Sequence, residues 1–378
     1  MKHILYIGGF ILPNGNAAAQ RVLANAKIFR DLGYEVTLVG LTHNGDGLEP
    51  FKYEDFDCIN LPYPESVLGW WKMLASIKQY IPFYKKETSI VIAYNHPAIA
   101  LKKLLKHNRK KGIKTLSDCT EWYEPQGGWL FRIIKGWDIN KRMYDVHTQL
   151  DGIISISKYL DDFYKKRGTK SLLLPPLVDI KEDKWKVQTN TSERISLLYA
   201  GSPAGTKDRL DYMIDALSAV ATKGKEFVFE IIGITEQQFR DVYLQGNQRP
   251  IPAFVAFRGR IQHEEVIKKL KEADFQIFLR EDHLANRAGF PTKFAETISA
   301  GTLVLTNASS NLKDYMQEGV NCFELDISSE DALVNSLLKP LSLSKEEITR
   351  TKGTIDSGMF DYRNYIGIVK SFLDDMQV

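Results

Sequence analysis

The stretch that decides the fold is "NRAGFPTKFAETISAGTLVLTN", residues 286–307. The apolar run upstream of it, Phe275–Arg280, and the run Leu303–Thr306 near its end each indicate a buried strand. Pro291 stands where the first residue of a helix belongs, and Gly301 stands just past the expected end of that helix. The stretch therefore predicts a strand–helix–strand unit, the building block of a parallel sheet covered by helices.

The same alternation of strand and helix runs through both halves of the chain. In the first half we expect helices near residues 16–32, 97–111 and 157–166, and strands at 3–8, 35–41, 56–61, 90–94, 114–117 and 152–156. In the second half we expect helices near residues 208–223, 264–272, 291–300, 311–317 and 330–338, and strands near 195–200, 227–233, 254–258, 275–280, 303–306 and 322–325.

These patterns predict an α/β fold class with two Rossmann-like domains, whose parallel sheets face each other across a cleft. The rigid segment Leu174–Val178 and the polar segment Lys181–Arg194 indicate the linker. We therefore expect an N-terminal domain over residues 1–185 and a C-terminal domain over residues 186–355. Residues 356–378 should form a C-terminal helix that packs back on the N-terminal domain.

Composition limits the class of protein. The chain has 378 residues, of which 44% are hydrophobic and 26% are charged, so it can bury a sizeable core. Its net charge is only +3, so local patches must supply any attraction to anionic partners. Cys58, Cys119 and Cys322 are widely spaced, which favours free thiols in a reducing cytoplasm. The sequence shows neither a signal-peptide pattern nor a membrane-spanning apolar run, so we expect a cytoplasmic protein.

Two loops of the second half offer sites for phosphate. After the strand Ile195–Ala200 the sequence reads "GSPAGTKDRLDYMIDAL", a glycine-containing turn that leads into a helix with Lys207 at its mouth. A helix N-terminus presents unpaired N–H groups, and a lysine beside it completes a phosphate site. The alternative is a solvated lysine in an ordinary loop.

The quoted stretch repeats this chemistry. Lys293 lies in the first turn of its helix, where a cation is unfavourable unless an anion binds there. Glu296 lies five residues beyond Pro291, which places it roughly 7–8 Å further along the helix axis. A carboxylate at that distance can accept hydrogen bonds from both hydroxyls of a ribose. An exposed helix residue would explain Glu296 but would leave Lys293 and the Gly-Phe-Pro turn unexplained.

These residues carry a resemblance to a known family. The segments "AGSPAGTKDRLDYMIDAL", "FRGRIQHEEVIKKLKEADFQIFLR" and "AGFPTKFAETISAGTLVLTN" resemble the donor domain of retaining glycosyltransferases of family 4, glycosyl transferases group 1, with the GT-B architecture. The resemblance is specific over roughly residues 195–325. It implies that Lys207 binds the donor diphosphate and that Glu296 holds the ribose. The backbone of Gly259, Arg260 and Ile261 would flank the base.

Two positions depart from the family pattern. The first Glu of its E-x7-E motif is replaced by Ala288, and Ser202 stands where many members have an arginine after the strand glycine. Ser202 remains a candidate donor contact. The GFPTK form of the helix start resembles a subgroup associated with bacterial surface polysaccharides, and it implies donor contacts from Gly289, Phe290, Pro291, Thr292 and Lys293.

The first half resembles an acceptor-binding domain. The segment "YIGGFILPNGNAAAQRVLANAKIFRDLGYEVTLVG" reads as strand, loop, helix and strand, and the resemblance places Gly15, Asn16 and Ala17 near the transferred sugar and the diphosphate. No G-x-G-x-x-G fingerprint is present, so the sequence does not favour a nicotinamide cofactor.

Candidate catalytic residues follow a predicted strand of this half. Asp118 and Glu121, in "IKTLSDCTEWYEP", lie where family members often carry a histidine or an acid that faces the sugar. The alternative is that Asp118 caps a turn and that Glu121 is solvated. His96, in "AYNHPAIA", also follows a strand, although a lone histidine before a proline is more often structural.

Other segments of the sequence bear on a metal ion and a membrane surface as partners. Asp55 and Asp57 form a D-x-D, but a hard cation needs more oxygen ligands, so we expect a metal-independent enzyme without a cofactor. Residues 101–114 are rich in Lys and Arg without one acid, and residues 70–86 mix aromatics with lysines. Either segment could meet an anionic membrane surface, or could be a solvated helix face. No nucleic-acid-binding module is recognisable.

The function that we expect is retaining transfer of a sugar, hexosyl or N-acetylhexosaminyl, from a nucleotide-diphosphate donor to a glycan or lipid-linked acceptor. The setting would be bacterial surface polysaccharide biosynthesis, in the cytoplasm or at the inner face of the membrane. A nucleotide-sugar epimerase of the same architecture is one alternative, and it would need acids around the sugar for proton transfer. A nucleotide-sugar-binding protein without catalysis is another, because Ala288 replaces a motif residue.

Overall fold

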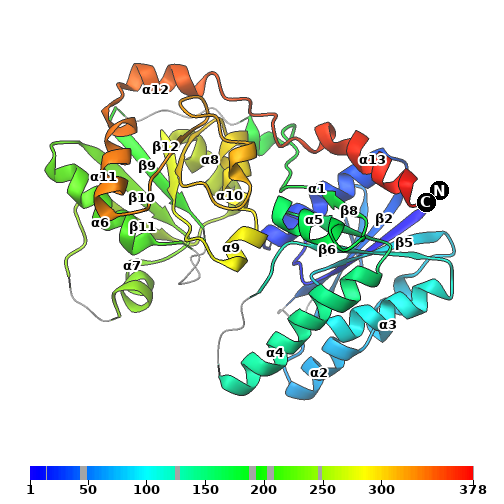
Figure 1. Cartoon of the computed structure of the whole chain (residues 1–378). Helices are drawn as coiled ribbons and strands as arrows, with labels where there is room; N and C mark the ends of the chain where they lie inside the picture. The colour runs from blue at the N-terminus through cyan, green and yellow to red at the C-terminus, as the bar shows by residue number, and fades with distance from the viewer. Residues whose placement is uncertain are drawn as a thin grey trace. The chain divides into compact units, whose positions relative to one another are not determined.

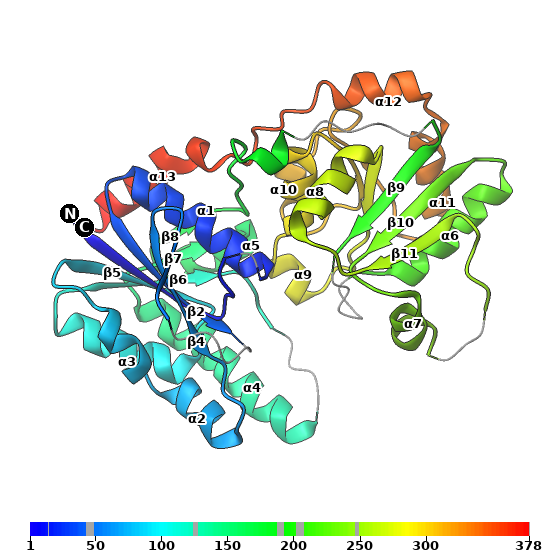
Figure 2. The ribbon, with the colours of Figure 1, turned by 180° about the vertical axis from the view of Figure 1, so that it is seen from behind.

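Two compact units make up the chain, shown from both sides in Figures 1 and 2. The computed structural model describes residues 1–13, 15–42, 49–123, 128–186, 193–201, 208–245 and 249–377. Unit 1 comprises Met1–Val178, Arg287–Phe290 and Tyr362–Val378. Unit 2 comprises Asp179–Asn286 and Pro291–Asp361.

Unit 1 is built on a parallel sheet. Within the described residues it has eight strands in the order β3-β4-β2-β1-β5-β6-β7-β8, and only the short edge strand β3 runs antiparallel to its neighbour. The strands are β1 (His3–Gly8), β2 (Glu35–Thr42), β3 (Phe51–Tyr53), β4 (Phe56–Pro62), β5 (Thr88–Tyr94), β6 (Lys114–Cys119), β7 (Gly152–Ser155) and β8 (Ser171–Leu173). The inner strands are apolar and buried on both faces, as parallel strands between two helix layers must be.

Helices cover both faces of this sheet. Both views show α2, α3 and α4 together on one side, while α13 lies against α1 on the other. The side chain of Asn16 accepts a hydrogen bond from the N–H of Ala19 and so fixes the start of α1. The helices are α1 (Ala17–Asp31), α2 (Val67–Ala75), α3 (Ala98–Arg109), α4 (Trp129–Lys141), α5 (Lys158–Lys165) and α13 (Ile366–Asp375).

Unit 2 repeats the design with a six-stranded parallel sheet in its described part, ordered β11-β10-β9-β12-β13-β14. Its strands are β9 (Ile195–Ala200), β10 (Phe227–Ile232), β11 (Val255–Gly259), β12 (Phe275–Phe278), β13 (Leu303–Thr306) and β14 (Cys322–Glu324). Its helices are α6 (Leu210–Thr222), α7 (Glu236–Phe239), α8 (His263–Glu272), α9 (Leu284–Ala288), α10 (Thr292–Ser299), α11 (Glu330–Leu338) and α12 (Lys345–Lys352). α9 runs from unit 2 into the short piece of unit 1.

The predicted fold class, two α/β domains with parallel sheets, is confirmed. Within residues 286–307, Pro291 is the N-cap of α10 and the helix begins one residue later, while Gly301 follows its end with φ 69°. A left-handed residue at that position closes a helix with little strain only if it is glycine. The strand–helix–strand unit β12-α10-β13 is therefore present as predicted.

Other parts of the secondary-structure prediction were wrong or incomplete. The helix expected at 311–317 is only a 3-10 turn, Leu312–Asp314, because the side chain of Asn321 takes the N–H of Gln317 and the carbonyl of Tyr315 into hydrogen bonds of its own. Helix α4 was missed. Its apolar residues lie on an exposed side, with Trp129, Ile133 and Trp137, as well as on the side that buries Ile139, so no single apolar stripe marks the helix.

Two further findings bear on the expected class of protein. The three cysteines are free and buried. None of the helices in the described parts of the chain combines the length and the apolar character that crossing a bilayer requires.

Candidate active site

The sheet of unit 2 changes direction of winding between β9 and β12, and four side chains meet at this point. Such switch points at the carboxyl ends of parallel strands are where α/β sheets bind ligands. Tyr199 comes from the end of β9, Asp208 from just before α6, Arg280 from just after β12 and Lys293 from the first turn of α10. Below, these four residues are called the Lys293 cluster.

Charges in the Lys293 cluster are tightly paired. Lys293 Nζ lies 2.6 Å from Asp208 Oδ2, and the hydroxyl of Tyr199 donates a hydrogen bond of 2.7 Å to the same oxygen. Arg280 Nε lies 3.4 Å from the other carboxylate oxygen. The ammonium also lies 4.2 Å from the centroid of the Tyr199 ring, a cation–π distance. Only 8% of Lys293 and 4% of Asp208 are exposed, so each charge depends on its partners for stabilisation.

The pair stays ionised at neutral pH. Burial opposes ionisation of Asp208, but Lys293 and Arg280 outweigh this and lower the pKa of its carboxyl group to about 2. Burial also lowers the pKa of Lys293, and the carboxylate of Asp208 works against that effect. Two cations face one carboxylate, so the cluster keeps one net positive charge. It is therefore suited to an anion.

Backbone donors add to this positive charge. α10 begins at Thr292, and among the described residues no side chain caps its N-terminus, which presents its N–H groups and the positive end of the helix dipole. Gly289, Phe290 and Pro291, which lead into the helix, are buried, whereas Thr292 is half-buried. The predicted anion site at Lys293 is thus built from both side chain and backbone.

Glu296 lies one turn further along α10. Its Oε1 is 3.1 Å from Nε2 of His263, the first residue of α8, and about a quarter of each side chain is exposed. Gly259 ends β11 with φ 66°, and the loop through Arg260 and Ile261 leads to His263. The structure therefore joins Glu296 to His263, two residues beyond the segment that was expected to flank a base.

Two of the predicted donor contacts, Ser202 and Lys207, lie outside the described residues. Ala288, which replaces the first Glu of the family motif, is fully buried at the end of α9. A carboxylate at a buried position would need partners of its own.

We predict that Asp208→Asn destabilises unit 2 by about 3–5 kcal/mol, because it leaves Lys293 buried without a counter-ion. The folded-state pKa of about 2 lies below the ordinary value of 3.8, so the carboxylate stabilises the native protein above about pH 4. That contribution is lost as the pH falls towards 2, and the variant should lack this loss. Chemical denaturation followed across this pH range measures both effects.

The matched control is Asp215→Asn, which removes a half-exposed carboxylate that pairs with Arg249. It should cost less than about 1 kcal/mol. Inorganic pyrophosphate should stabilise Asp208→Asn more than the native protein, because it can replace the missing charge. Equal stabilisation of both proteins would show that Lys293 does not meet the anion.

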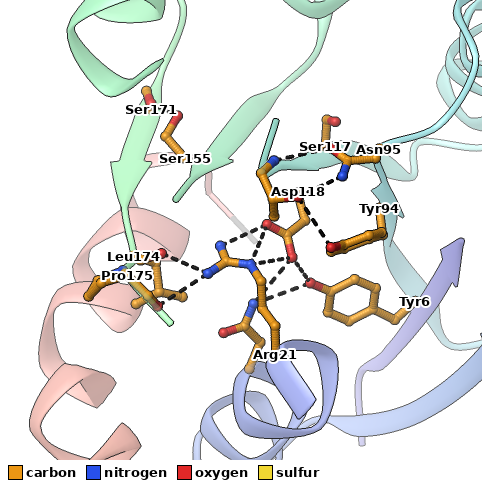
Figure 3. A network of polar contacts seen from close by, with 12 residues as sticks. Tyr6, Arg21, Tyr94, Asn95, Ser117, Asp118, Ser155, Ser171, Leu174 and Pro175 are labelled. Atoms are coloured by element: carbon orange, nitrogen blue, oxygen red, sulfur yellow. Dashed lines mark hydrogen bonds and ion pairs between the residues drawn. The ribbon is translucent and has the colours of Figure 1, made fainter. Parts of the chain in front are cut away.

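In unit 1, Asp118 is the centre of a buried polar network (Figure 3). Arg21 Nη2 and Nε lie 2.8 and 3.0 Å from its Oδ1, and the hydroxyl of Tyr6 donates a hydrogen bond to its Oδ2 at 2.5 Å. Asn25 Nδ2 lies 3.4 Å from that second oxygen. Asp118 is 0% exposed, so its carboxylate is fully occupied by protein donors.

The same network fixes the chain beyond β8. Arg21 Nη1 donates to the carbonyl oxygens of Leu174 at 2.9 Å and Pro175 at 3.2 Å. Helix α1, strands β1 and β6 and this segment are thus tied together by one guanidinium and one carboxylate. These contacts support a structural role for Asp118. Its catalytic role stays a prediction.

Glu121 is placed differently. It is half-buried and lies in the loop after β6. In the same loop, Thr120 N–H donates to Asn95 Oδ1 at 3.1 Å, which links the ends of β5 and β6. Of the two predicted catalytic residues, Glu121 is the one that is partly accessible.

The other candidate site residues of unit 1 lie at the start of α1, where they are accessible, except for His96, which is buried. Gly15 and Ala17 are exposed at the start of α1, and Asn16 caps that helix. A Cβ on Gly15 would come within 2.5 Å of Ile11, so only glycine fits there. His96 is buried against Tyr80, and burial lowers its pKa to about 4, so it is neutral at physiological pH.

We predict that Asp118→Asn lowers the unfolding free energy of unit 1 by about 3–5 kcal/mol, because Arg21 would remain buried and charged. Replacing both partners, as Arg21→Met with Asp118→Leu, should cost less than the single change. The control Asp162→Asn, which removes an exposed pair with Lys158, should cost about 0.5 kcal/mol at most. Normal stability of Asp118→Asn would contradict the structural role.

Asp55 and Asp57 are held by cations of their own. Asp55 lies 3.5 Å from Arg30, and Asp57 lies 3.0 Å from Lys52 and 3.1 Å from Lys85. Across the described residues, no group of three or more His, Cys, Asp and Glu side chains could hold a metal ion.

Sequence reasoning missed four residues of these sites: Arg21, Asp208, His263 and Arg280. Asp208 and His263 lie directly beside segments that were singled out, at the end of "AGTKD" and in "GRIQH". Arg21 gave no signal, because its partner Asp118 is 97 residues away in the sequence.

Comparison with known proteins identifies the class of enzyme. Residues 179–352 match the model of a protein family described as Glycosyl transferases group 1. No curated protein sequence matches the chain. The family match includes all strands of unit 2 and confirms the enzyme class expected from the sequence, a glycosyltransferase.

Solved structures resemble the chain over its whole length. Sucrose-phosphate synthase from Thermosynechococcus elongatus has a TM-score of 0.69 at 14% identity, with 100% of this chain and 99% of that chain covered. The Anabaena protein HepE in complex with UDP-glucose also has a TM-score of 0.69, at 12% identity, with 99% and 100% covered. A UDP-forming trehalose-phosphate synthase from Burkholderia xenovorans has 0.68 at 9% identity, with 100% of both covered. These likenesses confirm the predicted GT-B fold class.

Proposed function

We propose that this protein is a retaining glycosyltransferase of family 4, which moves a hexosyl or N-acetylhexosaminyl group from a nucleotide-diphosphate donor to a glycan or lipid-linked acceptor. The Lys293 cluster carries the proposal, because it places a net positive charge beside a free helix N-terminus at the switch point of unit 2. The Anabaena structures in complex with UDP and glucose, or with UDP-glucose, support a donor of this class.

Stabilisation of the leaving group is the main task of such a site. Departure of the diphosphate leaves an oxocarbenium-like sugar and puts negative charge on the phosphate oxygens. Lys293, the N–H groups at the start of α10 and the predicted contact Lys207 would stabilise that charge. Asp208 holds Lys293 in position and keeps its ammonium charged, and Arg280 adds the charge that makes the cluster net positive.

Glu296 would bind the ribose. Its second oxygen and its partial exposure leave room for a diol, and His263 orients the carboxylate from the neighbouring helix. The base would then lie against the loop of Gly259, Arg260 and Ile261. Attack of the acceptor hydroxyl from the same face as the leaving group would pass its proton to the departing phosphate, so no strong protein base is needed.

The proposed setting is bacterial surface polysaccharide biosynthesis, on the cytoplasmic side of the membrane. The GFPTK form of the α10 start supports this assignment, and an acceptor on a lipid carrier would bring the enzyme to the bilayer. Glu121, and the start of α1 with Gly15, Asn16 and Ala17, would serve the acceptor and the transferred sugar, while Asp118 would act through its buried network by fixing the end of β6 and the start of the loop that carries Glu121.

The test of the reaction class is incubation with labelled nucleotide sugars in EDTA. We expect donor hydrolysis, or transfer when an acceptor is present, at nearly the rate seen without EDTA, because protein cations take the role of a metal. Sugar isomerisation would favour the epimerase instead, and binding without turnover would indicate an inactive relative. Loss of activity that Mg²⁺ or Mn²⁺ restores would contradict metal independence.

We predict that Glu296→Gln lowers donor affinity by roughly 10- to 150-fold, since it loses a charge-assisted hydrogen bond of about 1.5–3 kcal/mol. Native protein should bind the ribose donor more tightly than its 2′-deoxy analogue, and the variant should discriminate much less. Titration calorimetry with both donors measures the difference.

The matched control is Glu264→Gln, which changes an exposed Glu on α8, the helix that carries His263. It should leave both affinities unchanged. If Glu296→Gln binds both donors as the native protein does, Glu296 is a solvated helix residue and the nucleotide lies elsewhere.

A further inference from the structure

Helix α4 of unit 1 exposes a stripe of large apolar side chains. Trp129, Ile133 and Trp137 are 74%, 61% and 52% exposed, although side chains of this kind usually face a core. They are four residues apart, so they lie on one side of the helix. Three exposed side chains in one row form a patch rather than the scattered apolar residues of an ordinary surface.

The patch continues into a groove between α3 and α4. Trp137 and Ile99, which is itself 37% exposed, belong to its apolar lining, and the groove has a volume of about 210 Å³. Lys102, Lys106 and Lys141 also line it. The groove therefore combines an apolar lining with lysine ammonium groups.

Positive charge predominates around the groove between α3 and α4. Helix α3 carries Lys and Arg residues and not a single acid. Asp138, the acid of α4, accepts a hydrogen bond from the N–H of Ala98 at 2.9 Å and so caps the start of α3. Asp145 lies between Lys102 and Lys141 and is shared by both. The acids near the groove are thus engaged, and the lysines exceed them in number.

We propose that this α3–α4 face, made of Trp129, Ile133, Trp137, Lys102 and Lys106, docks on the surface of an anionic lipid bilayer. Tryptophan rings are favoured at the boundary between headgroups and acyl chains, and lysines bind anionic headgroups. A second copy of the chain would bring like charges together, which disfavours a homodimer through this face. The proposal deepens the proposed function and rests on its lipid-linked acceptor.

Binding to phosphatidylcholine vesicles with and without phosphatidylglycerol tests the docking. Sedimentation should show binding that requires phosphatidylglycerol and that weakens as salt is raised. Lys102→Ala with Lys106→Ala should reduce the partition coefficient by roughly 25-fold, since each cation near such a surface contributes about fivefold. Trp129→Ser with Trp137→Ser should reduce it by at least ~10-fold through lost apolar burial.

Matched controls come from other exposed positions. Ile368→Ser changes an apolar side chain that is 49% exposed on α13, and Lys166→Ala with Lys223→Ala removes two exposed lysines. These variants should bind vesicles as the native protein does. All the changed side chains are exposed, so the variants should fold, and thermal unfolding checks this.

Three outcomes would overturn the docking surface: no vesicle binding by the native protein, equal loss in the controls, or a change of oligomeric state in the tryptophan variants. The last would assign the face to a second copy of the chain. Stabilisation by UDP, measured on the same variants, separates the two proposals. Normal UDP binding without vesicle binding would reject the docking surface alone, whereas vesicle binding without binding of any nucleotide sugar would reject the donor site alone.

Discussion

The ion pair between Lys293 and Asp208 is the interaction on which the candidate donor site depends. A lysine in the first turn of a helix is repelled by the helix dipole, and burial further disfavours its charge. Asp208 compensates both effects at 2.6 Å, while Arg280 restores a net positive charge. The site therefore holds a desolvated cation in a fixed position, which is the arrangement that stabilises charge developing on a phosphate.

Unit 1 uses a related device for a different purpose. The Arg21–Asp118 pair is buried more completely than the Lys293–Asp208 pair, and its remaining hydrogen bonds go to Tyr6, to Asn25 and to two backbone carbonyls. The hydrogen bonds of this pair are therefore all made to other groups of the protein. The Lys293 cluster of unit 2 has two cations, Lys293 and Arg280, for one carboxylate, whereas in unit 1 one guanidinium faces one carboxylate. Balanced charge suits a pair that ties α1 to the inner strands β1 and β6, and an excess of positive charge suits a cluster that binds an anion.

Much of the fold and part of the candidate site could be predicted, for local reasons. Strand β9, strand β13 and helix α11 have the predicted bounds, because each is set by an uninterrupted apolar run or a clear cap. Lys293 and Glu296 were identified because their positions on one helix follow from its geometry. Helix α4 was missed because its apolar residues, such as the exposed Trp129 and the buried Ile139, do not fall on one side of the helix.

The sequence by itself determined the α/β class, the strand–helix–strand unit around Pro291 and Gly301, and the chemical types gathered at the start of α10. These features depend on neighbours within a few residues, where backbone propensity and side-chain period act. Only the tertiary structure decided that Lys293 is paired with Asp208, that Asp118 is enclosed by Arg21 and Tyr6, and that Glu296 meets His263. Those partners are 85, 97, 112 and 33 residues apart in the sequence, and they meet because parallel strands bring their carboxyl ends to one edge of a sheet.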